Sequence, residues 1–343
     1  MIDDARLDSL SYSLARYREV TPRLAFRAKD IPAWKSQAKA RLLELLGPMP
    51  ADRVPLKRIE EKVTDKGSYS RIPVRFSTRA DMDAFGYLLV PGGVQDKDAA
   101  PAIICLPGHG RGVDDIVGIG EDGNDRDSYD GYQHDFAVQC VKNGYVTLAI
   151  EPLGFGHRRD KAARAKGAGQ SSCQPSAGAA LMLGETMIGW RVWDTMRAID
   201  LLESLDYVDP NRIAVMGISG GGTVALFTAA IDERVKAAVL SCSFCTFKDS
   251  IYTVSHCIDN YVPGILRDLE VADITGLIAP RYLFAENGLD DDIFPASGVR
   301  DALDATRRIY AACGASDHVA HSFFSAGHVF HGEDTFKTLK TWL

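Results

Sequence analysis

Short apolar runs alternate with amphipathic stretches along most of the chain from about residue 100 onwards. The runs are residues 102–106, 145–150, 213–216, 235–240 and 281–285. Continuous apolar runs of this length are typical of strands that are buried on both faces of a parallel sheet. Between two of them, apolar side chains recur every three or four residues, which predicts an amphipathic helix; they are Ile188, Val192, Met196, Ile199 and Leu202. The alternation predicts an α/β fold with a mostly parallel central sheet covered by helices.

The first hundred residues follow a different pattern. Residues 1–53 have a helical pattern that ends at Gly47-Pro48, and we expect an N-terminal helical extension there. Residues 71–76 and 85–90 predict strands, so the sheet is expected to be mixed. The α/β domain would then span residues 54–343. Within it, residues 243–277 break the alternation and predict a lid or cap insertion.

Charge and cysteine content exclude several classes of protein. The 343 residues include 39 Lys and Arg against 46 Asp and Glu, a net charge of −7. No basic block is present that would attract nucleic acid or an anionic membrane. No apolar run is long enough to span a bilayer, and the acidic start argues against a secretory signal. Seven scattered cysteines fit reduced thiols. We therefore expect a cytoplasmic protein that acts on a small molecule, with a homo-oligomer left open.

A Gly-x-Ser-x-Gly motif at residues 217–221 carries the clearest chemical signal. It follows the apolar run at 213–216 directly and precedes a helical run at 223–230. This strand, turn and helix setting is the one the motif requires, because a sharp turn must expose the serine hydroxyl above the sheet. Glycines on both sides remove the Cβ atoms that would clash there. We predict Ser219 as a nucleophile. The alternative is a Gly-rich turn without chemistry, and the Gly-Lys-Ser/Thr ending of a phosphate-binding loop is absent.

Such a nucleophile needs N–H donors for a developing oxyanion. The N–H of Gly220 would lie at a helix N-terminus and is the first predicted donor. The second is expected from the loop after an earlier strand, where Pro-Gly-His-Gly-Arg-Gly follows the run at 102–106. We predict the N–H of Arg111, and the alternative is an ordinary turn. His109 and Glu151 are candidate substrate contacts, although loop organisation is the favoured interpretation of Glu151.

The general base and its acid should follow the serine in the order serine, acid, histidine. The last predicted strand spans residues 317–324. His328 lies in a loop just beyond it and is the predicted base, with His331 as the alternative. His318 and His321 would lie within that strand.

Three consecutive aspartates follow the preceding strand, and the pattern Gly-x-x-Asp-x-x-Phe-Pro selects Asp291. A carboxylate there would orient the imidazole and stabilise its charged form. Asp290 and Asp292 are expected to be solvated.

Cys242-x-x-Cys245, with His256-Cys257 nearby, could form a zinc or redox site. The spacing is loose for a tetrahedral zinc site, and no thioredoxin-like context surrounds it. We predict no metal and no organic cofactor.

Several motifs together resemble a family of α/β-hydrolases, the bacterial acetyl-xylan-esterase-like and dienelactone-hydrolase-related proteins. They are Pro107-Gly108-His109-Gly110, Tyr132-Gln133-His134-Asp135-Phe136-Ala137, Leu153-Gly154-Phe155-Gly156, Gly217-Ile218-Ser219-Gly220-Gly221, Asp291-Asp292-Ile293-Phe294-Pro295 and Gly327-His328-Val329-Phe330. The similarity runs from about residue 25 to the end. It implies an α/β-hydrolase fold and a triad at Ser219, Asp291 and His328. This sequence differs in having Asp292 where a proline is more usual. We also expect no leader of the kind that polysaccharide-degrading members often carry.

The resulting hypothesis is a serine esterase that forms an acyl-enzyme, acting on short acyl or acetylated-sugar esters. A peptidase or a carbon–carbon bond hydrolase with the same triad is one alternative. A non-catalytic binding protein on the same fold is the alternative from another class.

Overall fold

The computed structural model describes residues 7–27, 29–94, 99–129 and 131–343. The strands are β1 (Ile59–Glu60), β2 (Thr64–Asp65), β3 (Tyr69–Arg79), β4 (Met82–Pro91), β5 (Ala100–Leu106), β6 (Val146–Ile150), β7 (Val208–Ile218), β8 (Ala237–Ser241), β9 (Tyr282–Gly288) and β10 (Val319–Phe324). They form one sheet in the order β1-β3-β4-β6-β5-β7-β8-β9-β10, and β2 pairs with β3. The strands from β6 through β5 to β10 pair in parallel, whereas the β1, β2, β3 and β4 pairings are antiparallel. The mixed, mostly parallel sheet that the sequence predicted is confirmed.

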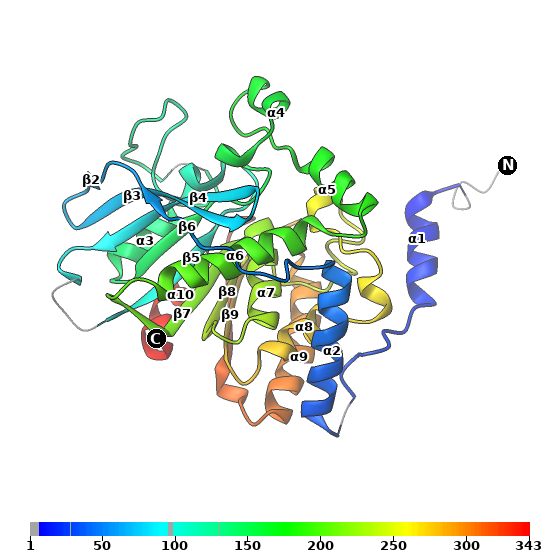
Figure 1. Cartoon of the computed structure of the whole chain (residues 1–343). Coiled ribbons are helices and arrows are strands. Elements are labelled where there is room, and N and C mark those ends of the chain that lie inside the picture. Colours follow the sequence, from blue (N-terminus) through cyan, green and yellow to red (C-terminus); the bar gives the residue numbers. More distant parts are fainter. Residues whose placement is uncertain (1–6, 28, 95–98, 130) are drawn as a thin grey trace.

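Helices cover both faces of this sheet (Figure 1). The α-helices are α1 (Ser9–Arg18), α2 (Ile31–Leu46), α3 (Phe136–Lys142), α4 (Lys161–Ala165), α5 (Cys173–Met182), α6 (Met187–Glu203), α7 (Gly220–Ile231), α8 (Val271–Ile278), α9 (Ala296–Ala312) and α10 (Glu333–Trp342). Short 3₁₀ helices are η3 (Gly112–Ile116), η4 (Gly156–Arg158), η5 (Ile258–Asn260), η6 (Ile265–Arg267) and η7 (Ser316–His318).

The central strand β5 shows how the sheet separates two cores. Ala102, Ile104 and Leu106 belong to the core shared with α2, α6, α7, α8 and α9. Ile103 and Cys105 point the other way, into the core shared with α3 and α10. Successive side chains of a strand alternate between its faces, so a strand buried on both sides must be apolar at every position. This explains the continuous apolar runs of the sequence.

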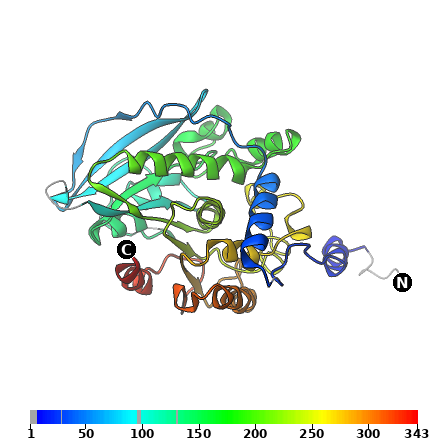
Figure 2. The same cartoon turned by 60° about the horizontal axis from the view of Figure 1, so that its bottom comes forward.

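The two helices of the N-terminal segment differ in how they pack. Helix α2 buries Trp34, Ala38, Leu42 and Leu46 in the main core. These positions are four residues apart and lie on one face of the helix. Helix α1 has no buried residue and lies at the edge of the molecule (Figures 1 and 2), where Tyr252 contacts the Tyr17 ring and bonds the carbonyl of Ser13. Helix α2 is thus part of the main core, whereas α1 is peripheral.

The segment at residues 243–277, expected as a lid, also divides into two parts. Residues 243–270 are loops with the short helices η5 and η6. Helix α8 is buried along its whole length and packs against α7 and α9. It therefore belongs to the layer that covers the sheet, and we use the word lid below for residues 243–270 only.

A membrane-spanning helix would need about 20 apolar residues. Within the described residues, every helix is too short or too polar for this.

Candidate active site

Ser219 lies in the turn between β7 and α7, with a φ of 54°. A positive φ is strained for a residue with a Cβ, and such strain at a strand-to-helix turn is typical of a nucleophile. The neighbouring glycines are required by space. A Cβ on Gly217 would lie 2.3 Å from the backbone of Gly221, and a Cβ on Gly221 would lie 2.0 Å from the carbonyl oxygen of Leu106. Only glycine therefore fits at these two positions of the motif without a steric clash.

Asp291 and His328 come together at the carboxyl ends of two neighbouring parallel strands. Strand β9 ends at Gly288 and pairs there with Phe324, the last residue of β10. The Oδ2 atom of Asp291 lies 2.8 Å from Nδ1 of His328. Its Oδ1 atom accepts the N–H groups of Ile293 and Phe294 at 2.9 and 3.1 Å. Both carboxylate oxygens thus have partners, and the imidazole is held in one orientation.

The electrostatics of this pair favour a charged carboxylate. Burial alone raises the pKa of Asp291, but the hydrogen bond and charge of His328 outweigh burial and hold that pKa below its ordinary value. The side chain of Asp291 is fully buried, whereas 16% of the His328 side chain is exposed. An imidazole exposed to the cavity and bonded to a buried carboxylate can accept a proton and stabilise the resulting charge.

Ser219, Gly220 and His328 line one open cavity of about 270 Å³. Tyr132 and Phe294 flank the His328 ring, with centroids 5.3 and 5.7 Å away. Polar side chains line the same cavity; they are His109, Ser255, His256 and Asn260. A larger apolar cavity of about 350 Å³ lies between α1 and the lid and shares Asn260 with the first. Neither Ser219 nor His328 lines that second cavity.

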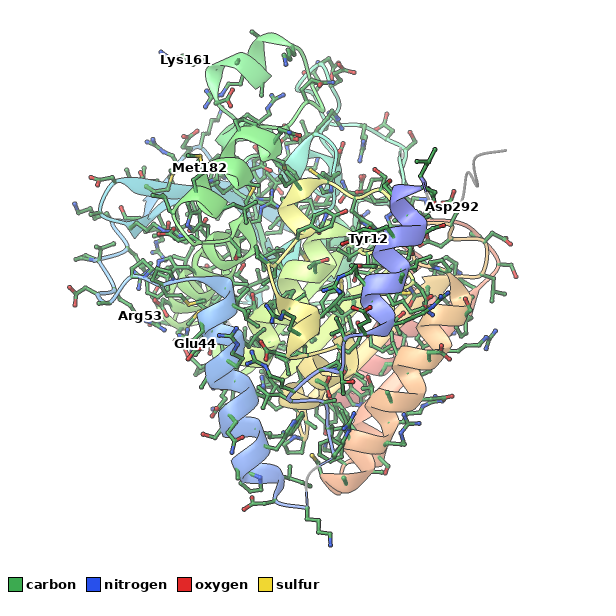
Figure 3. The ribbon with its side chains drawn as sticks, turned by 90° about the vertical axis from the view of Figure 1, so that its right-hand side faces the viewer. Tyr12, Glu44, Arg53, Lys161, Met182 and Asp292 are labelled. Carbon is green, nitrogen blue, oxygen red and sulfur yellow. The ribbon has the colours of Figure 1, made fainter. Side chains whose placement is uncertain are left out.

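The other candidates for base and acid make different contacts. The ring of His331 stacks on Phe324. Nδ1 of His318 bonds the carbonyl of Pro280, and Nε2 of His321 bonds the side chain of Asn287 at 3.2 Å. Asp290 and Asp292 are exposed, and Figure 3 shows Asp292 at the molecular surface. Among the alternatives that the sequence left open, only His328 and Asp291 combine with Ser219 at one site.

The prediction of Arg111 as an oxyanion donor is contradicted by its contacts. Its backbone N–H donates to Oδ2 of Asp115 at 2.7 Å. Its guanidinium bonds the same carboxylate and the carbonyl of Ile119. An N–H that already serves a carboxylate is not free to stabilise a second negative charge. The turn has positive φ at Gly110 and Gly112, and within it the Asp115 carboxylate accepts the N–H of Arg111.

Glu151 does not contact the cavity either, which corrects its prediction as a substrate contact. It is fully buried, and its two oxygens accept the N–H groups of Val113 and His157 at 3.2 and 3.1 Å. Burial raises its pKa to about 7. A Cβ at Gly112 or Gly156 would lie 2.0 Å from its carboxyl oxygens. Glu151 therefore organises two loops, as the favoured interpretation held.

Two residues of the site carried no signal that the sequence analysis used. Tyr132 donates from its hydroxyl to the carbonyl of His109 at 2.8 Å and also interacts with the Ser219 side chain. Burial raises the pKa of Tyr132, so the phenol stays neutral. Asp259 of the lid lies 3.2 Å from Nε2 of His109. The motif that contains Tyr132 carries only a family resemblance, and no recognised motif surrounds Asp259.

Cys242 and Cys245 do not share a site. The thiol of Cys242 donates to the carbonyl of Val329, and that of Cys245 to the carbonyl of Pro295. Burial raises the pKa of each thiol to about 12, which keeps it protonated. Among the described residues, no cluster of metal-binding side chains contains both.

Sequence and structure comparisons relate this chain to hydrolases. It is 29% identical over 325 residues to "Putative hydrolase YtaP" of Bacillus subtilis (strain 168), an alignment that covers 90% of this chain and 100% of that protein. The fold is similar to that of a crystal structure from Bacteroides fragilis NCTC 9343, titled a "putative acetyl xylan esterase", with a TM-score of 0.76 and 21% identity, over 93% of this chain and 82% of the other. It is also similar to a glucuronoyl esterase from Solibacter usitatus, with a TM-score of 0.62 and 16% identity, over 94% and 93%.

These solved structures support the α/β-hydrolase architecture that the strand order already indicates. The family is decided by a match that covers far more of the chain than the short motifs do. Residues 13–325 match the model of the Abhydrolase family, and this chain belongs to that family.

Proposed function

We propose that this protein is a serine esterase, with Ser219, His328 and Asp291 as its triad and short acyl or acetylated-sugar esters as its substrates. The observation that carries the proposal is the strained turn of Ser219, which shares one cavity with an imidazole bonded to a buried carboxylate. The similarity of the fold to acetyl xylan and glucuronoyl esterases supports an ester as the bond that is cleaved.

In the proposed reaction, His328 accepts the proton of Ser219 as the hydroxyl attacks the ester carbonyl. The charged imidazole then gives that proton to the leaving alcohol, which breaks the ester bond and leaves an acyl-serine. Water attacks the acyl-serine with His328 again as base, and the acid is released. Asp291 keeps the imidazole in the required tautomer throughout.

The oxyanion of each tetrahedral intermediate needs two N–H donors. Gly220 is the first residue of α7, so its N–H has no acceptor within the helix. In place of Arg111 we assign the backbone N–H of His109 as the second donor. Gly108 is packed so tightly that a Cβ on it would lie 3.0 Å from Cβ of Ser219. The backbone N–H of His109, which follows Gly108 directly, therefore lies close to the nucleophile. The Tyr132 hydroxyl donates to the carbonyl of His109 and helps to fix this part of the loop.

The composition of the cavity favours a hydroxylated alcohol portion. Aromatic rings of Tyr132 and Phe294 offer faces for a sugar ring, and Ser255 and Asn260 offer hydrogen bonds. Burial lowers the pKa of His256 to about 4, so this lining residue is neutral at pH 7. This polar and aromatic lining suits the hydroxyl groups and ring faces of an acetylated sugar.

A substrate panel tests this function. Aryl esters of graded acyl length, acetylated xylose and xylo-oligosaccharides, a methyl glucuronate ester, an aryl amide and a β-diketone would be compared by kcat/KM. The proposal expects the acetyl esters to be preferred. Labelling of Ser219 by a fluorophosphonate, identified by peptide mass spectrometry, separates an enzyme from a binding protein. A folded wild-type chain that neither reacts with the probe nor hydrolyses any ester would refute the proposal.

A further inference from the structure

A second cluster of reactive side chains lies beside the candidate triad and takes no part in the proposed reaction. It contains Nε2 of His109, the thiols of Cys173 and Cys257, and a carboxylate oxygen of Asp259. These four atoms all lie within 4.8 Å of one another. Three segments supply them, namely the loop after β5, the start of α5 and the lid at η5. Only the tertiary structure brings these segments together.

The His109 imidazole is directed into this cluster without a satisfactory partner. Its Nε2 atom lies 3.2 Å from Oδ1 of Asp259, a charge-pair distance. The same atom is buried and has no hydrogen bond of acceptable direction. Buried ring nitrogens are normally bonded, so each exception calls for an explanation. An atom at the centre of the cluster would provide the missing partner.

Charge balance points to a divalent cation. The guanidinium of Arg191 bonds Oδ2 of Asp259 and lies 3.4 Å from the thiol of Cys173. Arg191 is itself buried, and the carbonyl of Leu153 fixes it through two hydrogen bonds of 3.0 and 2.8 Å. As metal ligands, Cys173 and Cys257 would be thiolates, and together with the Asp259 carboxylate they would carry three negative charges. One divalent ion together with Arg191 neutralises them, which a buried site requires.

We propose that His109, Cys173, Cys257 and Asp259 bind one zinc ion. Nitrogen, sulfur and carboxylate oxygen are the donors that zinc takes in tetrahedral protein sites, with bonds of about 2.0–2.3 Å. Ligand atoms in such a site lie about 3.3–3.8 Å apart by that geometry, so a small contraction of the cluster suffices. The two sulfurs favour zinc over magnesium or calcium, which prefer oxygen. Arg191 does not coordinate the ion but orients two of its ligands, Asp259 and Cys173.

The position of the site gives the ion a structural role in the enzyme. Cβ on Gly220 would lie 3.1 Å from the His109 ring, so this ring packs against the first residue of α7. Cys257 and Asp259 belong to the lid, and Cys257 also lines the cavity of Ser219. Zinc would therefore tie the lid to the loop whose backbone N–H we assign to the oxyanion. The described residues contain one other such cluster, Cys242 with Asp291 and His328, which is the candidate triad itself.

Metal content of the full-length protein tests the site directly. The wild-type chain would be purified from zinc-supplemented culture, dialysed at pH 7 and analysed by inductively coupled plasma mass spectrometry. The proposal expects about one zinc per chain. Cys173→Ser and Cys257→Ser should each lower the content at least tenfold. Cys313→Ser replaces a half-buried thiol outside the cluster, and His328→Ala changes the other cluster; both variants should keep the zinc of the wild type.

Cobalt provides a second measurement that does not depend on how well one variant folds. Co²⁺ added to metal-stripped wild-type protein should produce near-ultraviolet thiolate charge-transfer absorption, which Cys313→Ser retains and Cys257→Ser loses. Wild-type protein that binds neither zinc nor cobalt would overturn the proposal. So would a Cys173–Cys257 disulfide in a non-reducing peptide map of freshly purified protein. These measurements do not use ester hydrolysis, so their failure would leave the proposed function standing.

Discussion

Two aspartate–histidine pairs flank Ser219, and their environments differ. In the first, Asp291 bonds Nδ1 of His328 at 2.8 Å, and its other oxygen accepts two backbone N–H groups. In the second, Asp259 lies 3.2 Å from Nε2 of His109 without a well-directed hydrogen bond. Its other oxygen bonds the buried cation of Arg191, and two thiols lie beside it.

The difference shows that a pair of residue types does not define a role. Among the described residues, the Asp291 carboxylate forms hydrogen bonds with His328 and with two backbone N–H groups, and no cation pairs with it, so its charge is available to stabilise the protonated imidazole. Asp259 shares its charge with a guanidinium and with further metal-binding atoms. We therefore interpret the first pair as part of the triad and the second as part of a binding site that positions the oxyanion loop.

Removing the nucleophile between the two pairs should have the largest effect. Ser219→Ala is expected to lower kcat on a short-chain aryl ester about 10⁴-fold or more, because neither pair can act without the attacking hydroxyl. Steady-state kinetics would measure this, with circular dichroism to verify folding. Near wild-type turnover in a folded variant would show that another residue attacks the ester.

The first pair should be nearly as sensitive. Asp291→Asn is expected to lower kcat about 10³–10⁴-fold, because an amide stabilises the wrong tautomer of His328 and not its charged form. The exposed neighbour provides a matched control, and Asp292→Asn should stay within about twofold of the wild type because surface substitutions have small effects. Equal losses in both variants would contradict the choice of Asp291.

Changes in the second pair should affect zinc binding more directly than turnover. Asp259→Asn is expected to lower zinc content at least tenfold and kcat/KM about tenfold to 100-fold, since it removes a ligand rather than a member of the triad. Asp291→Asn should keep its zinc. Measuring zinc content and turnover in both variants would show whether the two pairs have separate roles. If Asp259→Asn kept its zinc while losing as much turnover as Asp291→Asn, the two pairs would have one role and the comparison would fail.

Tyr132 connects the two pairs, because its hydroxyl bonds the carbonyl of His109 and its ring flanks His328. Tyr132→Phe keeps the ring and removes the hydroxyl that bonds the His109 carbonyl and interacts with Ser219. At about 1 kcal/mol for each hydrogen bond, kcat/KM should fall at least about fivefold. The pH dependence of kcat should keep its shape, since the imidazole keeps its carboxylate. A shifted profile would mean that the phenol itself takes part in proton transfer.

The smallest effect concerns the stability of the lid that carries Asp259. Glu270, at the end of the lid, accepts the N–H of Phe247, and burial raises its pKa from an ordinary 4.5 to about 8. The folded chain thus holds this proton more tightly than the unfolded chain. The resulting stabilisation is complete below about pH 4.5 and is lost as pH rises towards 8 and beyond.

Glu270→Gln should therefore reduce the fall in melting temperature between pH 5 and pH 9, as measured by differential scanning fluorimetry. Glu61→Gln, at an exposed position, should follow the wild-type curve. A variant curve parallel to the wild type would show that Glu270 is not the group that titrates.

Local chemistry made much of the active centre predictable. The motif around Ser219 can be interpreted from about ten consecutive residues, because steric clashes in one turn decide which neighbours of the serine are allowed. Asp291 follows the strand of the apolar run at 281–285, and His328 follows the last predicted strand, at residues 317–324. Parallel neighbours bring such loops to the same edge of the sheet. Arg111 was placed wrongly because the path of a glycine-rich loop depends on a carboxylate four residues ahead, Asp115, and not on local propensity.

The sequence by itself determined the alternation of strands and helices, the turn of Ser219 and the order of the predicted triad. These features depend on side chains close together along the chain or on a regular period. Only the tertiary structure decided which of the three aspartates is buried, that α8 belongs to the core, and that Glu151 supports loops. It alone brought His109, Cys173, Cys257 and Asp259 together. Such a cluster joins segments far apart in sequence, and the contacts that hold it leave no period or spacing to read.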